Sequence, residues 1–443
     1  MDKVSFLRIF YYLLAFVVPP LTFSAVIIYK SISDISFTDP EPFDISELKS
    51  PEIDKNKLTA LIVVGNKGTE ITDFLAPYEI LSRTGKFNVF TVAPQRIISP
   101  LNGGIDFIPH FSLDGIDNSF EADPDLIVVP NIPNIQSPED KVLIDWIRNQ
   151  DDGETVFLSI CEGARTLAAA GLLANKKATT HWSAIGHLRG QYPGTEWISG
   201  KRFVEDGNII SSPGVVTGSV DGTLYAVEKL LGKQKAHEIA ENLGYSHYGD
   251  SKLSPVRIGL PDSVWLVTAL YPWSKDEIGV YIKDGIGEID LASILDVYPR
   301  SFTAVTYTLS NERKAIKSKN GLYFVPTFDF KTIGYLDRVI SLANNLEQEE
   351  KDFFGKYYKH LNIEYSHNLE HKAADFAYDR TLLDLSAREN QSVTRSVSKT
   401  LEYTIDHLKL AGRGWPFHLL LGPLILGIAG VLFARWFEKR YLV

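Results

Sequence analysis

A single cysteine, Cys161, has the sequence setting of a catalytic nucleophile. It follows the apolar run TVFLSI and precedes Glu162, Gly163 and Ala164, which lead into the helical pattern RTLAAAGLLA. A strand that ends in a nucleophile flanked by small residues and turns at once into a helix is a nucleophile elbow. The turn exposes the side chain at the carboxyl edge of the sheet, and the helix N-terminus stabilises a thiolate. The alternative is a buried structural cysteine, which is common for this residue type.

The cysteine count also excludes several kinds of chemistry. With one cysteine in 443 residues, no intramolecular disulfide can form, and a zinc or iron-sulfur site built on cysteines is ruled out. His367 and His371 fit the H-x-x-E-H pattern of inverted zinc peptidases. They lie in a polar stretch with a helical pattern and no evident third ligand, so we expect a solvated helix face. We expect neither a metal nor a cofactor.

The segments around Cys161 alternate between strand and helix patterns. Short apolar runs include LTALIVVG, FNVFTVA, PDLIVVP and NIISSPG, and amphipathic stretches such as TDFLAPYEILSRTG and GTLYAVEKLLG separate them. This alternation predicts an α/β fold with a parallel sheet covered by helices on both faces. The carboxyl ends of parallel strands meet at one edge of the sheet, where ligands bind.

Residues 58–235 resemble the DJ-1/PfpI (ThiJ/PfpI) family of the class I glutamine amidotransferase-like fold. The resemblance rests on ICEGARTLAAAGLLANKKATTHW, on IVVGNKGTEITDFLAPYEIL upstream and on RFVEDGNIISSPGVVTGSVDGTLYAVEKLLG downstream. It implies a flavodoxin-like α/β sandwich, often dimeric, with a reactive cysteine at Cys161. It also implies an acidic partner of the thiol at Asp73 and a histidine at His181. The most similar branch is the one that also provides the sensor half of AraC-type transcriptional regulators.

Asp73, His181 and Glu162 are the candidate partners of Cys161. Asp73 follows the first strand, and burial near the thiol would keep its carboxyl protonated and able to donate to a thiolate. A helix N-cap or a surface acid is the alternative for Asp73. His181 is a candidate general base or acid, or else a structural histidine. Glu162 stands where members with peptidase-like triads carry histidine, which weakens a peptidase interpretation.

The loop after the third strand departs from the family pattern. Many members have two glycines there, whose backbone amides can form an oxyanion hole, whereas this chain has Asn131 and Ile132. A β-branched residue does not tolerate the unusual backbone angles that glycine allows. We therefore expect this hole to be distorted or absent.

The sequence also contains an internal repeat. Residues 60–113 align with 277–330 without a gap, and the alignment places identical residues on one another, among them Arg83 on Arg300, Gly104 on Gly321 and Phe107 on Phe324. Glycine, proline and aspartate matches at turn positions favour a duplicated strand-helix-strand-hairpin unit over chance similarity. The second copy has no cysteine, so it cannot carry the same chemistry. The residues that follow, 333–414, are expected to be mostly helical.

Two uncharged runs, residues 9–29 and 415–434, flank these domains. Each has about 20 residues, enough for a helix to cross a bilayer. A cleaved signal peptide is the alternative for the first run and a buried core helix for the second. The basic residues beside the runs place both termini in the cytoplasm and the main domain outside the cell membrane, by the positive-inside rule.

Charge is unevenly distributed along the chain. The whole chain carries a net charge of −10; residues 1–29 contribute +1 and residues 415–443 contribute +2, so residues 30–414 carry −13. A domain this acidic has no electrostatic reason to bind nucleic acid and is repelled by an anionic membrane surface. The mean hydropathy of −0.04 averages the two apolar ends and this acidic middle.

Together these patterns predict six segments. They are an N-terminal transmembrane helix (1–30), an acidic linker (31–57), a DJ-1/PfpI-like domain (58–235), a connector with a degenerate half-repeat (236–332), a helical region (333–414) and a C-terminal transmembrane helix (415–437).

Two classes of function follow. One is an enzyme of hydrolase or lyase type in which Cys161 attacks a small electrophile such as an aldehyde, isocyanide or amide. The other is a non-catalytic ligand-binding or redox-sensing module. Expected partners are a small molecule and the membrane, and the family resemblance adds a second copy of the chain.

Overall fold

The structure is a computed structural model. It describes residues 3–34, 37, 39–118, 123–249, 256–257, 259, 262–270, 275–343, 345–359, 363–365, 376–414 and 421–441. His367 and His371 lie outside these residues.

The first α/β unit is built on a seven-stranded sheet with the order β10-β11-β7-β6-β1-β2-β5. All neighbouring strands are parallel except the pair β10 and β11. The strands are β1 (Leu58–Val63), β2 (Phe87–Ala93), β5 (Phe111–Ser112), β6 (Leu126–Val129), β7 (Val156–Ile160), β10 (Val204–Asp206) and β11 (Ile209–Ser212). A small two-stranded sheet, β8 (Lys177–Ala178) with β9 (Glu196–Trp197), lies beside it.

Helices cover both faces of this sheet, as the alternating sequence pattern predicts. On one face are α2 (Ile71–Arg83), α7 (Val215–Leu231) and α8 (Lys233–Asn242); on the other are α3 (Leu113–Asp117), α4 (Val142–Asn149), α5 (Gly163–Ala169) and α6 (Ile185–Gln191). Successive residues of a strand point to opposite faces, so Leu61 and Ile62 belong to two different hydrophobic clusters.

A second parallel sheet repeats the start of the first. Its order is β16-β13-β12-β17-β18, with β12 (Asp276–Tyr281), β13 (Ala304–Ser310), β16 (Phe328–Asp329), β17 (Arg338–Ser341) and β18 (Ile363–Tyr365). In the repeat alignment the first residue of β13 falls on that of β2, the first residue of β16 on that of β5, and the first residue of α10 (Glu288–Arg300) on that of α2. The second unit therefore has the same strand-helix-strand order as the first.

The expectation that residues 333–414 are mostly helical is wrong in one part. The run Arg338–Ser341 is strand β17, which pairs parallel to β12 as β6 pairs with β1, and β18 extends the sheet further. Its short apolar run is compatible with either structure, and the free sheet edge beside β12 decides the outcome. The rest holds α11 (Gln348–Tyr357), α12 (Ala377–Arg388) and α13 (Gln391–Thr400), and α9 (Ser263–Leu270) precedes the second sheet.

The two units meet through their hairpins and first helices. β3 (Ser99–Leu101) and β4 (Ile105–Ile108) form one four-stranded sheet with β14 (Ile316–Lys317) and β15 (Tyr323–Pro326). In the antiparallel β4-β15 pair, Phe107 lies opposite Phe324, its own counterpart in the repeat. In the same strands Ile108 lies opposite Tyr323 and Asp106 lies opposite Val325. The repeat alignment places Asp106 on Tyr323 and Ile108 on Val325, so these two pairs are equivalent. This register is that of a two-fold, isologous contact within one chain.

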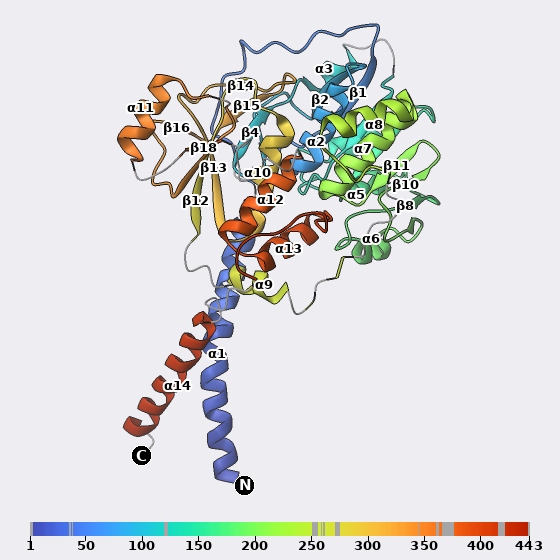
Figure 1. Cartoon of the computed structure of the whole chain (residues 1–443). Coiled ribbons are helices and arrows are strands. Elements are labelled where there is room, and N and C mark those ends of the chain that lie inside the picture. The colour runs from blue at the N-terminus through green and yellow to red at the C-terminus, as the bar shows by residue number, and fades with distance from the viewer. Residues whose placement is uncertain are drawn as a thin grey trace.

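The helices extend this pseudo-symmetry. α2 contacts α10 between the two sheets, and α12 lies against α10 as α7 lies against α2 (Figure 1). Two copies of an α/β unit thus form one continuous core, and the hairpins and first helices of both copies bury one another.

The terminal helices α1 (Lys3–Asp34) and α14 (Leu421–Tyr441) project together from the globular part, and both chain ends lie at their far end (Figure 1). Each contains an apolar stretch long enough to span a membrane, Leu7–Val26 and Leu421–Tyr441. They contact each other, with Arg8 Nε 3.0 Å from Glu438 Oε1. Gly430 lies against the backbone of Ala15, an approach that small residues permit between helices.

Candidate functional site

Cys161 occupies a nucleophile elbow. It lies between β7 and the start of α5 at Gly163 and has a φ of 55°, a left-handed conformation that is uncommon for a residue with a side chain. Two glycines allow the tight turn. A Cβ at Gly163 would collide with the carbonyl oxygen of Val129, and one at Gly214 would lie 2.5 Å from the Cβ of Cys161. Gly163 is part of the small-residue pattern that marks the elbow in the sequence, whereas Gly214 lies downstream between β11 and α7.

The thiol of Cys161 is enclosed. Only 5% of the residue is exposed. Burial raises the pKa of the Cys161 thiol well above its ordinary value, and the nearby carboxyl groups of Asp73, Glu70 and Glu162 raise it further. Cys161 is therefore a neutral thiol at neutral pH in this conformation, and thiols react far more slowly than thiolates.

Asp73 lies in the first turn of α2 and is fully buried. Its carboxyl oxygens accept hydrogen bonds from Ser219 Oγ and from the backbone N–H of Asn131, both at 3.3 Å. Burial raises the pKa of Asp73 to about 7. Its carboxyl group can thus hold or release a proton near neutral pH beside Cys161, although no hydrogen bond joins the two among the described residues.

The loop after the third strand, where we expected a distorted or absent oxyanion hole, makes this hydrogen bond to Asp73. The backbone N–H of Asn131 donates to Asp73, its carbonyl oxygen accepts from the backbone N–H of Glu70, and Ile132 is buried. The Asn131 amide is therefore already committed to a protein acceptor and is not free to stabilise a developing oxyanion.

An arginine from the second copy reaches this site. Arg300, at the end of α10, lies 2.9 Å from Glu70 Oε1 and 2.5 Å from Asp296 Oδ1. Glu70 caps α2 by accepting from the backbone N–H of Asp73 at 2.7 Å. Arg300 therefore holds the cap residue that precedes Asp73. The repeat aligned Arg300 with Arg83, but the sequence did not show that the two copies face each other.

His181 does not contact Cys161. Its Nδ1 lies 2.7 Å from Ser183 Oγ and its Nε2 lies 3.4 Å from the carbonyl oxygen of Thr400. Burial lowers the pKa of His181 to about 4, so the ring is neutral at physiological pH. The preceding residue, Thr180, donates to the carbonyl oxygen of Cys161 at 2.8 Å. The structure brings His181 near the elbow but directs its ring nitrogens to other partners.

A segment from the C-terminal part of the chain contacts residues that lie near the elbow. This cover segment, residues 400–402, consists of the last residue of α13 and the two residues that follow it. The carbonyl oxygen of Leu401 accepts from the backbone N–H of Val216 at the start of α7. Glu402 accepts from the backbone N–H of Trp182 at 2.9 Å. No pattern in the sequence indicated that a segment so far along the chain would contact Val216 and Trp182 near the elbow.

Glu162 is placed next to the thiol by the chain but turns to solvent and to Arg165, with which it forms an ion pair. The four candidate residues therefore separate into two groups. Cys161 and Asp73 are both buried, and the carboxyl group of Asp73 raises the pKa of the Cys161 thiol. The side chain of Glu162 pairs with Arg165, and that of His181 contacts Ser183 and Thr400. No group of three or more possible metal ligands occurs in the part of the chain that the structure describes.

The fold and the elbow define the class of protein: a flavodoxin-like α/β domain with a cysteine at the strand-to-helix turn. Residues 58–220 match the DJ-1/PfpI family. Isonitrile hydratase of Pseudomonas putida is 29% identical over 196 residues, which are 43% of this chain and 78% of that protein.

Other relatives extend the comparison. Protein dj-1beta of Drosophila melanogaster is 26% identical over 196 residues, covering 42% of this chain and 96% of that protein. Its crystal structure aligns with a TM-score of 0.38 at 25% identity, over 42% of this chain and 97% of that one. The HTH-type transcriptional regulator CdhR of Pseudomonas aeruginosa is 34% identical over 99 residues, which are 22% of this chain and 29% of the regulator. These relatives are distant homologues.

Proposed function

We propose that this protein is a membrane-anchored sensor in which Cys161 reacts reversibly with a small electrophile and the cover segment reports the reaction to the membrane. The observation that carries the proposal is the cover segment. Leu401 and Glu402 accept hydrogen bonds from the backbone N–H groups of Val216 and Trp182 near the elbow, and the segment belongs to the stretch of chain that leads from α13 to α14. A group added to the thiol occupies space beside this segment and displaces it.

The chemistry of such a reaction fits the buried thiol and its acid. With an aldehyde, Cys161 Sγ forms a bond to the carbonyl carbon while the thiol proton passes to the carbonyl oxygen, which gives a hemithioacetal. Asp73 can relay this proton, because its pKa is raised by burial to about 7. The raised pKa of the Cys161 thiol keeps the unliganded site unreactive until the cover opens.

We infer that α1 and α14 cross the cell membrane, with both termini in the cytoplasm and the α/β units outside. Support comes from the apolar lengths of the helices, the shared position of the two chain ends and the basic residues near those ends. A reporter fused to the C-terminus should give a cytoplasmic signal; an extracytoplasmic signal would contradict this topology.

The contact between the two copies already has the symmetry of a homodimer interface. We propose that the second copy takes the place of a partner subunit. A homodimer of the whole chain, which the family resemblance suggests, would then have to use another surface.

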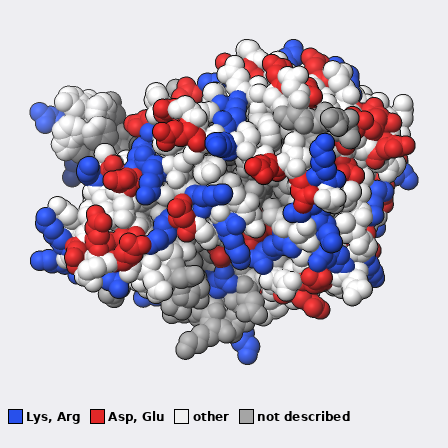
Figure 2. Space-filling model, turned by 90° about the horizontal axis from the view of Figure 1, so that it is seen from above, with Lys and Arg blue, Asp and Glu red and all other residues white. Residues whose placement is uncertain are grey.

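On the face seen in Figure 2, acidic and basic side chains are interspersed and do not form separate patches of one sign.

Hydrogen exchange of the full chain in lipid nanodiscs tests the sensor proposal. Carbamidomethylation of Cys161 with iodoacetamide should raise exchange in residues 400–405, because the added group displaces the cover segment. The Cys161→Ala variant, treated in the same way, should show no change. If exchange in residues 400–405 is the same before and after modification of the wild type, the sensor proposal fails.

A cysteine-dependent enzyme is the second candidate, and the elbow geometry of Cys161 favours it. The similarity to isonitrile hydratase makes isocyanides a sensible class to test, together with aldehydes and amides. Turnover that depends on Cys161, lost in Cys161→Ala, would support an enzyme. Absence of Cys161-dependent turnover over this panel would leave the sensor as the better account.

A further inference from the structure

Helix α9 connects α1 to parts of the chain that contact residues near the elbow. It contacts both α1 and α13, and Figure 1 shows it beside the upper part of α1. The apolar stretch of α1 ends at Val26, but the helix continues to Asp34, which adds about 12 Å of helix. Because the two parts belong to one helix, a change in the tilt of the apolar stretch also moves the upper part of α1.

The first link from α9 leads to the cover segment. Asp262, the residue before α9, is 1% exposed. Its two carboxylate oxygens lie 2.9 and 2.8 Å from Lys399 Nζ, and Oδ1 also accepts from Ser396 Oγ at 2.8 Å. Both partners are in the last turns of α13, and Lys399 directly precedes the cover segment. Breaking an ion pair with a buried carboxylate is costly, so the start of α9 and the end of α13 move together.

The second link leads to the arginine that the second copy contributes. The indole Nε1 of Trp265 donates to the backbone carbonyl oxygen of Arg300 at 2.7 Å, and the Trp265 ring lies 5.1 Å from the ring of Phe302. The side chain of Arg300 pairs with Glu70, the cap of α2. Helix α9 therefore contacts both of the segments through which the rest of the chain reaches the Cys161 domain.

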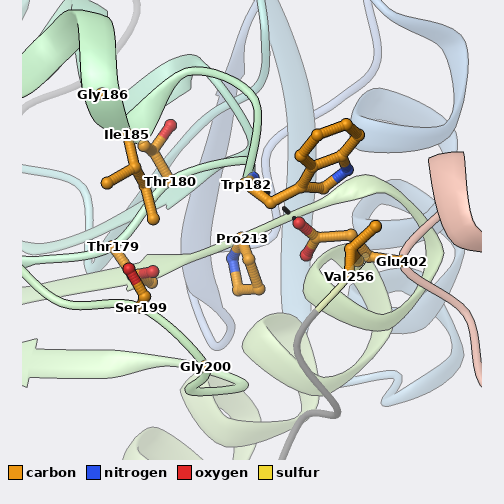
Figure 3. Close-up of a pocket in the computed structure, with 10 residues that line it drawn as sticks. All are labelled: Thr179, Thr180, Trp182, Ile185, Gly186, Ser199, Gly200, Pro213, Val256 and Glu402. Carbon is orange, nitrogen blue, oxygen red and sulfur yellow. Dashed lines mark hydrogen bonds between the residues drawn. The ribbon is translucent and has the colours of Figure 1, made fainter. Parts of the chain in front are cut away.

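The cover segment also has room to move. A pocket of about 250 Å³ adjoins it, and Trp182, Pro213 and Glu402 are among the lining residues (Figure 3). A single hydrogen bond of 2.9 Å, from the backbone N–H of Trp182, holds Glu402 in the view of Figure 3. A fully packed interior resists displacement, whereas a segment that lines a pocket can shift into it.

We propose that the bilayer regulates access to Cys161 through α9. A tilt of α1 shifts α9, and the ion pair between Asp262 and Lys399 passes this shift to the end of α13 and to the cover segment. The inference rests on the proposed sensor function and adds the opposite direction to it. Coupling between two sites is reciprocal, so a membrane segment that responds to modification of Cys161 must also change the equilibrium between the closed and the open cover.

The rate of Cys161 alkylation by N-ethylmaleimide in nanodiscs tests the proposal, because this rate follows the population of the open cover. Dimyristoleoyl-phosphatidylcholine gives a thin bilayer and dierucoyl-phosphatidylcholine a thick one, and apolar helices tilt more in the thin bilayer. We expect the two rates to differ by about fivefold or more. Equal rates would overturn the proposal. The sensor function is tested separately, by hydrogen exchange in one bilayer, so failure of the one is distinguishable from failure of the other.

Two variants test the role of α9, because the chain also joins the cover segment to α14. Asp262→Asn removes the charge but keeps an acceptor for Ser396, and Lys399, at 35% side-chain exposure, can be hydrated. Lys399→Gln removes the other charge and leaves Asp262 the backbone donor of Gly259. Each should reduce the difference between the two bilayers to less than about twofold. A difference that stays at the wild-type value in both variants would overturn the proposal.

Two further variants are controls. Lys399→Arg keeps the charge opposite Asp262 and should keep the wild-type difference between the two bilayers. Glu205→Gln breaks an ion pair with Lys229, whose side chain is 33% exposed, in the first copy and away from α9 and α13. It should also keep the wild-type difference. Loss of the difference in Glu205→Gln would show that any broken surface pair has this effect and would overturn the assignment to α9.

Discussion

The two copies of the α/β unit meet through equivalent contacts but have different roles at the interface. In each copy, an acid on the first helix reaches the first turn of the opposite helix. Glu79 on α2 accepts from the backbone N–H of Ile289, and Asp296 on α10 accepts from Thr72 Oγ1. Glu79 and Asp296 are counterparts in the repeat alignment, and each also pairs with the arginine one helical turn later.

The difference lies in the residues at either end of these helices. Arg300 continues past Asp296 to Glu70, while its counterpart Arg83 donates to the backbone oxygen of Asn242. Asp73 remains buried beside Cys161, whereas its counterpart Asp290 is paired with an arginine on α12. The first copy contains the candidate residues Cys161 and Asp73, and the second supplies Arg300, which pairs with the cap residue Glu70. Loss of the cysteine in the second copy therefore does not remove that copy from the site.

The largest expected effect is on the free energy of unfolding, from changes at the β4-β15 contact between the two copies. Phe107 and Phe324 lie opposite each other and are both fully buried. Replacing either with alanine should lower the free energy of unfolding by about 3–5 kcal/mol, because each change leaves a cavity in the same shared core. Denaturant titration measures both. The two losses should agree to within about 2 kcal/mol, which is the spread found for one kind of deletion at unrelated sites. A larger difference would show that the two copies contribute unequally to this contact.

Asp73 and its counterpart Asp290 should differ in how they make the free energy of unfolding depend on pH. The pKa of Asp73 is raised from 3.8 to about 7. The folded state therefore binds the extra proton, and the stability that it contributes is present below about pH 4 and is lost as the pH rises to about 7. The expected slope over this range is about 1.4 kcal/mol per pH unit.

Asp73→Asn should remove this slope, and unfolding titrations from pH 4 to 8 measure it. Asp290→Asn is the comparison, because Asp290 is 38% exposed in its side chain and paired with Arg380. We expect a smaller change there. The same pH profile for wild type and Asp73→Asn would show that Asp73 does not hold a proton in the folded state.

A smaller effect separates the two hairpins. Gly104 and Gly321 are counterparts, and both have positive φ, 86° and 107°. Alanine at either position should cost about 1–2 kcal/mol in backbone strain. A Cβ at Gly104 would also lie 2.9 Å from the carbonyl oxygen of Thr306 in the other copy, while one at Gly321 has space.

Gly104→Ala should therefore be about 1–3 kcal/mol less stable than Gly321→Ala. Denaturant titration of the two variants measures the difference. Equal stabilities would mean that the interface tolerates the extra carbon and that the two hairpins are not closely packed.

Much of the architecture was predictable from the sequence, and the assembly of the site was not. The alternation of apolar strands and amphipathic helices predicts the first sheet, and the small residues around Cys161 predict the elbow, because both depend on local sequence. The aligned Arg300 and Phe324 pointed to a repeat but not to a contact between its copies. Arg300, Leu401 and Glu402 reach the site only through long-range packing, which leaves no local pattern. The strand at residues 338–341 was missed for the same reason: a neighbouring sheet edge determines it.

The central claim is that the second copy and its cover segment close the Cys161 site. The rate of alkylation of Cys161 by N-ethylmaleimide at pH 8, followed by intact mass, tests it directly, because the chain has no other thiol. We expect the wild type to react on the order of 100-fold more slowly than an exposed cysteine.

Leu401→Ala should accelerate the reaction at least about tenfold by loosening the cover. Leu336→Ala, an equal deletion in the core of the second sheet, is the control and should react at close to the wild-type rate. A wild type that reacts as fast as a free thiol, or a Leu401→Ala variant no faster than Leu336→Ala, would contradict the account.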